Sequence, residues 1–211
     1  MQLVLASHNA KKLAELRAFL GDLGVALLSQ RDLGIPEAEE PHGTFIENAL
    51  AKARHAAAAS GHAAIADDSG VCVDALAGAP GVVSAHFAPV AAADLAGLDR
   101  EAQRALQDAA NNALLLQRLH GMAERSARFV STLVAVRHAA DPEPLVAVGR
   151  WPGLILAAPR GEGGFGYDPL MFIPELDCTV AQMDAALKHA HSHRARAMAQ
   201  MQALLREAWG L

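Results

Sequence analysis

The stretch AAIADDSG is expected to be a buried strand that runs into two adjacent aspartates, Asp67 and Asp68, and a turn. Neighbouring carboxylates repel each other unless a cation lies close by, and Mg²⁺ prefers carboxylate and water oxygens as ligands. Asp68 could therefore hold a metal ion or take a proton from an attacking water molecule. A solvated turn is the alternative, because Asp-Ser-Gly is a common turn sequence. The acidic loop that contains Glu37, Glu39 and Glu40 offers either a further metal ligand or a solvated charge cluster.

A second group of polar residues lies in ASHNAKKLAEL, between the first apolar run and the first helical pattern. Ser7, His8 and Asn9 occupy the turn expected there, and the free N–H groups of a helix N-terminus bind anions. Lys12 follows in the first helical turn, where the helix dipole disfavours a cation unless that cation shares an anion with the backbone. We interpret the turn as part of a phosphate site and assign no role to His8. Simple helix capping by Ser7 or Asn9 is the alternative.

A glycine-rich segment, RGEGGFGYDP, contains a GxGxxG match. A dinucleotide site needs a helix directly after the glycines, and the Tyr-Asp-Pro that follows cannot begin one. We therefore reject that interpretation. The segment instead presents Phe165, Tyr167 and Asp168 close together, and an aromatic ring beside a carboxylate suits the recognition of a flat heterocycle. The alternative for Phe165 is a place in the core.

The segment LKHAHSHRARA combines histidines with basic residues. His189 and His193 are four residues apart, which is a zinc-ligand spacing on a helix, but no cysteine or carboxylate lies at a matching spacing nearby. Ser192 can cap the last helix and so place His193 and Arg194 in its first turn. Lys188 and Arg194 would then supply donors for phosphate or carbonyl oxygens.

Strands and helices must position these residues. The apolar periodicity predicts strands at 2–6, 25–28 and in AAIADDSG, a hairpin formed by 127–138 and 144–156, and helices at 11–20, 44–60, 94–119 and 192–209. Thr44 with Glu47 has the spacing of a capping box, and the third helix has a possible break near Asp99. This mixture of strands and helices, with a hairpin, predicts an α/β fold with a mixed sheet.

Composition limits the class of protein. The 211 residues carry a formal charge of −5, which argues against a general nucleic-acid binder. Cys72 and Cys178 form no CxxC pair, and the N-terminus lacks a signal-peptide pattern, so we expect a reduced, cytoplasmic protein. The uncharged stretch from Ala75 to Ala93 is interrupted by glycines and prolines, so we expect no membrane span.

Several motifs occur together, in this order: SHNAKKLAE, EEPHGTFIENALAKA, ADDSG, GAPGVVSAHF, GGFGYDPLMF and SHR. Over nearly the whole chain they resemble the noncanonical purine nucleoside triphosphate pyrophosphatases (inosine/xanthosine triphosphatases, Ham1-like). The resemblance implies Mg²⁺-dependent hydrolysis of ITP, dITP and XTP to the monophosphate and pyrophosphate, by a homodimer. It also implies a single domain over 1–211, in which a long central mixed sheet carries two α/β lobes that flank a cleft.

The resemblance also implies roles for particular residues. Asp68 would be the catalytic base and, with Glu40, a metal ligand. The residues near the N-terminus and Lys52 would bind the triphosphate, and those near the C-terminus would bind the purine. The full set of substrate-binding residues would be Ser7, His8, Asn9, Ala10, Lys11, Lys12, Lys52, Ser69, Phe165, Gly166, Tyr167, Asp168, Lys188, His193 and Arg194. The chain departs from the family pattern at His86, where arginine is usual.

Two other functions fit these motifs less well. A Maf-like nucleotide pyrophosphatase would carry an N-terminal pair of arginines, which this chain lacks. A catalytically silent purine-nucleotide sensor would not need Asp68 and Lys12, which are both present. The favoured prediction is therefore the pyrophosphatase.

Overall fold

The structure, a computed structural model, describes residues 1–8 and 10–211, and it describes no side chain at positions 10, 11 and 22. The described chain divides into two compact units. Unit 1 comprises Met1–Asp68, Ser131–Arg150 and Ser192–Leu211, and unit 2 comprises Ser69–Val130 and Trp151–His191. Each unit is therefore assembled from segments that are far apart in the sequence.

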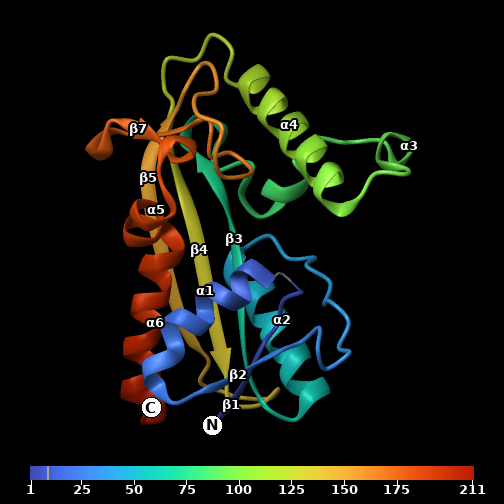
Figure 1. Ribbon diagram of the computed structural model, residues 1–211, viewed down its shortest axis with the longest axis vertical. Helices are drawn as coiled ribbons and strands as arrows, with labels where there is room; N and C mark the ends of the chain where they lie inside the picture. Colours follow the sequence, from blue (N-terminus) through green and yellow to red (C-terminus); the bar gives the residue numbers. More distant parts are fainter. Residues whose placement is uncertain (9) are drawn as a thin grey trace. The chain divides into compact units, whose positions relative to one another are not determined.

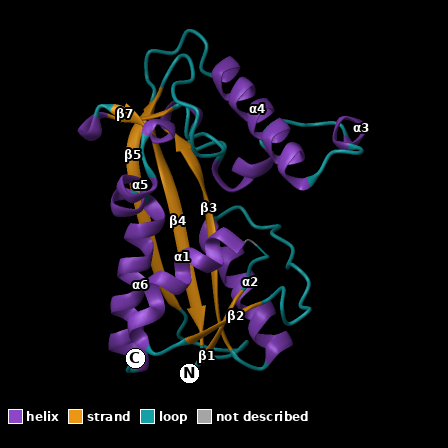
Figure 2. Cartoon of the chain, viewed as in Figure 1, coloured by secondary structure: helices purple, strands orange, loops and turns teal. Residues whose placement is uncertain are grey.

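The strands are β1 (Gln2–Leu5), β2 (Ala26–Ser29), β3 (Ala63–Val73), β4 (Ser126–Val136), β5 (Leu145–Ile155), β6 (Met171–Ile173) and β7 (Cys178–Thr179). The α-helices are α1 (Ala10–Leu20), α2 (Phe45–Ser60), α3 (Ala92–Leu95), α4 (Arg100–Arg118), α5 (Ala185–His191) and α6 (His193–Trp209). Strands and α-helices alternate from β1 to α3, whereas β4 to β7 follow one another before the last two helices (Figures 1 and 2). Short 3₁₀ helices lie between them, including one at Gly81–His86.

The strands form one seven-stranded sheet in the order β2-β1-β3-β4-β5-β6-β7. β1 pairs in parallel with β2 and β3, whereas β6 pairs antiparallel with β5 and β7. The long strands β3, β4 and β5 each contribute residues to both units. The predicted α/β fold with a mixed sheet is confirmed.

Unit 1 is a layered α/β structure in which helices cover both faces of the sheet. Side chains of a strand alternate between the faces, so Leu3 and Leu5 of β1 point to one side and Val4 to the other. Leu3 and Leu5 are buried with residues of α1 and α6, which pack against each other (Figure 1). Val4 is buried with the alanines of α2. This close packing against alanines explains why α2 is so rich in that residue.

Unit 2 has its own core, which contains Trp151, Phe129 and Leu115. Helix α4 packs against the short 3₁₀ helix at Gly81–His86, which lies within the uncharged stretch from Ala75 to Ala93. None of the described helices is long and apolar enough to cross a membrane.

The predicted helix caps are present. The Thr44 hydroxyl accepts the Glu47 N–H at the start of α2, and Ser192 accepts the Ala195 N–H at the start of α6. Asp99 caps α4, at the predicted break. One prediction was wrong: AAIADDSG does not end in a turn, because β3 continues through Asp67 to Val73.

Candidate active site

The two adjacent aspartates of β3 face different partners. The carboxylate of Asp67 lies 2.8 and 2.9 Å from Nζ of Lys12, whereas Asp68 lies 3.3 Å from Nζ of Lys52. Because successive side chains of a strand point to opposite faces, the continuation of β3 through this pair separates the two charges. Both aspartates are buried, so the alternative of a solvated turn is excluded. Each carboxylate has its own lysine.

The Asp68 side is a cluster of two carboxylates around one ammonium group. Nζ of Lys52 lies 2.7 Å from Glu40 and 3.3 Å from Asp68. Burial, together with the negative charge of Glu40, raises the pKa of Asp68 to about 6, although Lys52 opposes this shift. Burial lowers the pKa of Lys52, but Asp68 and Glu40 outweigh this effect and raise it overall. Asp68 therefore has the properties of a group that can accept a proton near neutral pH.

The same cluster fits a divalent cation by the chemistry of its donors. Glu40 and Asp68 already face one cation, the ammonium group of Lys52. Mg²⁺ is commonly bound by one or two carboxylates, with waters and substrate phosphates as its other ligands. Within the described residues no group of three or more His, Cys, Asp or Glu side chains is arranged to hold a metal ion.

The acidic loop that carries Glu40 is held by two side chains from neighbouring elements. The amide of Asn48, in α2, accepts the His42 N–H at 3.0 Å, donates to the His42 carbonyl at 3.2 Å, and also donates to Asp68 at 3.4 Å. The ring of His8 lies 2.9 Å from the Ile35 carbonyl oxygen, where the loop begins. His8, which the sequence left without a role, therefore anchors this loop.

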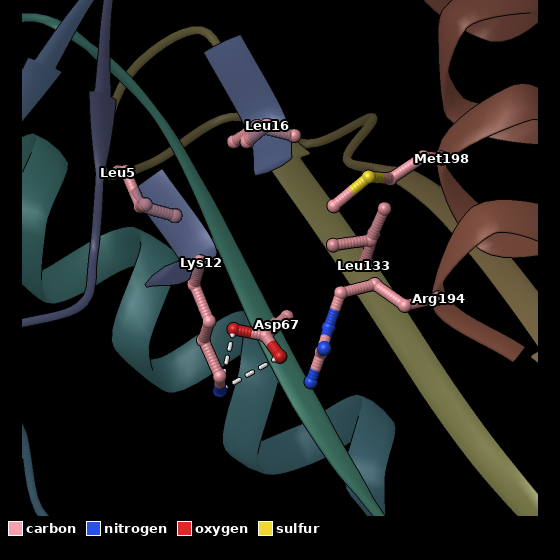
Figure 3. A pocket seen from close by; sticks show the side chains of 7 residues that line it. All are labelled: Leu5, Lys12, Leu16, Asp67, Leu133, Arg194 and Met198. Atoms are coloured by element: carbon pink, nitrogen blue, oxygen red, sulfur yellow. Dashed lines mark hydrogen bonds and ion pairs between the residues drawn. The ribbon is translucent and has the colours of Figure 1, made fainter. Parts of the chain in front are cut away.

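The Asp67 side is a small pocket within unit 1 (Figure 3). Lys12 of α1 and Arg194 of α6 both line it with Asp67, and its apolar wall consists of Leu5, Leu16, Leu133 and Met198. Its volume of about 10 Å³ is about that needed for one water molecule. Burial would raise the pKa of Asp67, but the charges of Lys12 and Arg194 lower it to about 2. The pocket thus contains two cations and one fully ionised carboxylate.

The predicted turn around Ser7 is only partly described. The Ser7 N–H donates to the Leu5 carbonyl, and the backbone of Ala10 begins α1. Asn9 and the side chains of Ala10 and Lys11 lie outside the described part of the chain. The assignment of these residues to a phosphate site therefore stays a prediction.

Unit 2 contains the second group of predicted site residues. The Phe165 side chain is 52% exposed, which excludes a place in the core. Nζ of Lys188 lies 4.5 Å from the centre of the Phe165 ring and 2.5 Å from the Asp168 carboxylate. The Phe165 N–H donates to the same carboxylate oxygen of Asp168 at 3.0 Å. An exposed ring, an ammonium group and a carboxylate are therefore held together around one short turn.

Tyr167 and Gly164 explain how this turn keeps its shape. Tyr167 is buried, and its hydroxyl donates to the Ser84 carbonyl at 2.9 Å, so its ring anchors the turn and leaves only its backbone for a ligand. Gly164 has a φ of +77°, and a Cβ atom there would collide with the Asp168 side chain. Gly161, Gly163 and Gly164 are thus required by close packing, whereas Gly166 has open space beside it and is favoured by its positive φ.

The remaining predicted residues fall into the two units. Arg194 and His193 begin α6 in unit 1, and Arg194 lies 3.1 Å from Glu15. Ser69 follows Asp68 on β3 and belongs to unit 2. His86, where the family pattern has arginine, is exposed at the end of a 3₁₀ helix. Each unit therefore holds one chemically distinct group, with carboxylates and cations in unit 1 and the aromatic turn in unit 2.

Sequence reasoning missed four polar residues that support these groups: Asn48, Asp67, Asp108 and Asn112. Asp67 was noticed only as the neighbour of Asp68, although strand alternation could have revealed its separate place. The other three lie on helices α2 and α4 without any local motif, and only their contacts distinguish them.

Comparisons with known proteins agree with the predicted resemblance. Residues 3–204 match the model of the Ham1 family. The chain is 67% identical over 211 residues to the dITP/XTP pyrophosphatase of Leptothrix cholodnii, with all of both chains covered. It is 68% identical over 209 residues to the dITP/XTP pyrophosphatase of Methylibium petroleiphilum, with 99% of each covered. A solved structure, the HAM1 protein from Coxiella burnetii, matches with a TM-score of 0.88 and 38% identity, over 99% of this chain and 100% of that one.

Proposed function

The chain belongs to the Ham1 family, and from this premise we propose that it hydrolyses dITP, ITP and XTP to the nucleoside monophosphate and pyrophosphate. The observation that carries the proposal is the cluster of Glu40, Lys52 and Asp68, in which the buried Asp68 can act as a base near neutral pH. In this assignment the residues of unit 1 bind the triphosphate, and the aromatic turn of unit 2 binds the purine.

The chemical step begins with a water molecule that Asp68 orients by accepting a hydrogen bond. As the water oxygen attacks phosphorus at the α–β anhydride, its proton moves to the Asp68 carboxylate and pyrophosphate departs with the electrons of the broken P–O bond. Lys12 and Lys52 neutralise the negative charge that the phosphates bring and that increases on the leaving group. Glu40 and Asp68 would hold Mg²⁺, which supplies further charge neutralisation when bound.

Base selection is assigned to Phe165, Lys188 and Asp168. The exposed ring of Phe165 provides a face for stacking, which is favourable for any purine. The ammonium group of Lys188 is a donor that suits the 6-oxo group of hypoxanthine and xanthine. Adenine carries an amino group at that position and would leave the donor unpaired, which is a strong basis for discrimination.

We further propose that the protein acts as a homodimer in the cytoplasm, as one functional domain. Cys72 and Cys178 form no disulfide in the described part of the chain, which fits a reducing compartment. Light scattering on the purified protein at micromolar concentration tests the assembly, and a monomer there would contradict it.

Pyrophosphate release tests the activity directly. With Mg²⁺ present, we expect rapid release from dITP, ITP and XTP and much slower release from dATP and dGTP. We expect Asp68→Asn to abolish release while nucleotide binding, measured by calorimetry, is kept. Asp32→Asn, which removes an exposed carboxylate elsewhere in unit 1, is the matched control. If the parent protein binds dITP without releasing pyrophosphate, it is a nucleotide sensor and the proposal is wrong.

A further inference from the structure

The turn from Phe165 to Asp168 is held at its central residue by helix α4. Gly166 has a φ of +60°, in the left-handed region that favours glycine. Its N–H donates to the Asp108 carboxylate at 2.7 Å, and its carbonyl accepts from the Asn112 side-chain amide at 2.9 Å. Both hydrogen-bonding groups of the Gly166 backbone are therefore held from outside the turn.

Asp108 and Asn112 are suited to this contact by their spacing. They are four residues apart on α4, so their side chains lie on the same face of the helix, one turn apart. The two side chains are also complementary to a peptide backbone, because the carboxylate can only accept and the amide can donate. Replacing Asp108 with asparagine, or Asn112 with aspartate, would change the pattern of donors and acceptors that faces Gly166.

The same helix also supports the other side of the turn. Asn111 donates to the carbonyls of Ser84 and Ala85, both at 3.2 Å, and the Ser84 carbonyl is the one that accepts the Tyr167 hydroxyl. Residues 108, 111 and 112 thus connect α4 to two consecutive residues of the turn, Gly166 directly and Tyr167 through Ser84.

The burial of Asp108 and Asn112, which these two contacts require, costs free energy. Burial, with a contribution from the nearby charge of Asp168, raises the pKa of Asp108, while the bond from Gly166 opposes the shift. Asn112 Oδ1 is buried and has no hydrogen-bond partner among the described residues. A buried polar atom without a partner destabilises a fold, so the placement of Asn112 indicates a function beyond packing.

We infer that Asp108 and Asn112 are positioning residues for purine recognition, which hold Gly166 so that Phe165, Asp168 and Lys188 keep the geometry that selects the base. The inference rests on the proposed function of this turn. Neither residue touches the substrate in this assignment, and both act through the Gly166 backbone.

The test compares Asp108→Ala, Asp108→Asn and Asn112→Ala with the parent protein. We expect KM for dITP to rise about tenfold in each alanine variant, as for the loss of one hydrogen bond to a charged or buried group, with a smaller change in kcat. The preference for dITP over dGTP should fall in parallel. Asp108→Asn keeps an acceptor oxygen and should stay within about threefold of the parent KM. Gln117→Ala, an exposed position on the same helix, is the matched control.

Inorganic tripolyphosphate distinguishes a positioning role from general damage. It carries the phosphates without a base, so its inhibition constant should be unchanged in every variant. Equal losses for dITP and tripolyphosphate, or an unchanged KM and base preference in both alanine variants, would overturn the inference. If circular dichroism shows that Asp108→Ala does not fold, the comparison of Asn112→Ala with Asp108→Asn still tests the inference. If the parent protein releases no pyrophosphate from dITP, the proposed function is wrong. If the parent protein is active and both alanine variants keep its KM and base preference, only the inference about Asp108 and Asn112 is wrong.

Discussion

Replacing Asp67 with asparagine removes the negative charge that lies between two cations in unit 1. The Asp67 side chain is only 5% exposed, and that of Lys12, 2.8 Å away, is 25% exposed. Arg194 lines the same pocket. Since the pair is largely shielded from water, its stabilising effect should be larger than that of a surface ion pair. We expect Asp67→Asn to destabilise the protein.

The magnitude follows from the pKa of Asp67. Lys12 and Arg194, against the effect of burial, lower this pKa from 3.8 to about 2. A difference of one in pKa corresponds to about 1.4 kcal/mol, so ionised Asp67 contributes about 2 kcal/mol to the free energy of unfolding. Because the folded-state pKa is the lower one, this contribution is complete above pH 4 and is lost as the pH falls through about 2. At pH 3 about half of it remains, which is about 1 kcal/mol.

Urea unfolding followed by far-ultraviolet circular dichroism, in the presence of a chelator, measures this contribution. The free energies of unfolding of the parent protein and Asp67→Asn should differ by about 2 kcal/mol at pH 6, and this difference should shrink by about 1 kcal/mol at pH 3. Lys12→Met in both backgrounds completes a double-mutant cycle, which should give a coupling energy of similar size. Asp32→Asn should show no such difference. A gap between parent and Asp67→Asn that is the same at pH 6 and pH 3 would refute the reasoning.

Three further predictions concern single residues. Tyr167 is the only tyrosine in the sequence, and burial raises its pKa, so phenolate absorbance should appear well above pH 10 in the folded protein. The free energy of unfolding should accordingly fall as the pH rises above 10. Tyr167→Phe, which cannot donate a hydrogen bond to the Ser84 carbonyl, should lack this fall. Titration of the Tyr167 phenol near pH 10 would contradict the prediction. In Gly149→Ala the new Cβ would collide with the His193 carbonyl oxygen, so urea unfolding should show a loss of about 1–3 kcal/mol, and an unchanged midpoint would count against this close approach. Phe165→Ala should raise KM for dITP about tenfold through lost stacking while leaving thermal unfolding unchanged, and Phe165→Tyr should restore KM; a parent-like KM in the alanine variant would exclude the ring from binding.

Local sequence patterns predicted many of the helices and strands. The capping residues Thr44 and Ser192 marked the starts of α2 and α6, because an N-cap depends only on the residues next to it, whereas Asp99, which caps α4, was predicted only as a possible break. For β3 the sequence predicts a strand that runs into the two aspartates and then a turn, since Asp-Ser-Gly is usual in turns. In the protein it continues, because the buried carboxylates are matched by Lys12 and Lys52 and the strand can pair on both sides.

The amino-acid sequence by itself determined the α/β class, the family and the residue types of both groups, because these depend on short motifs and on periodicity. Only the tertiary structure decided which residue each of these side chains contacts. Asp67 and Lys12 are 55 residues apart, and Gly166 lies 58 residues from Asp108. Contacts over such distances depend on strand order and helix packing, which no local motif encodes. Strand alternation alone would place the adjacent Asp67 and Asp68 on opposite faces of β3, while the lysine that each of them contacts could not be predicted from the sequence.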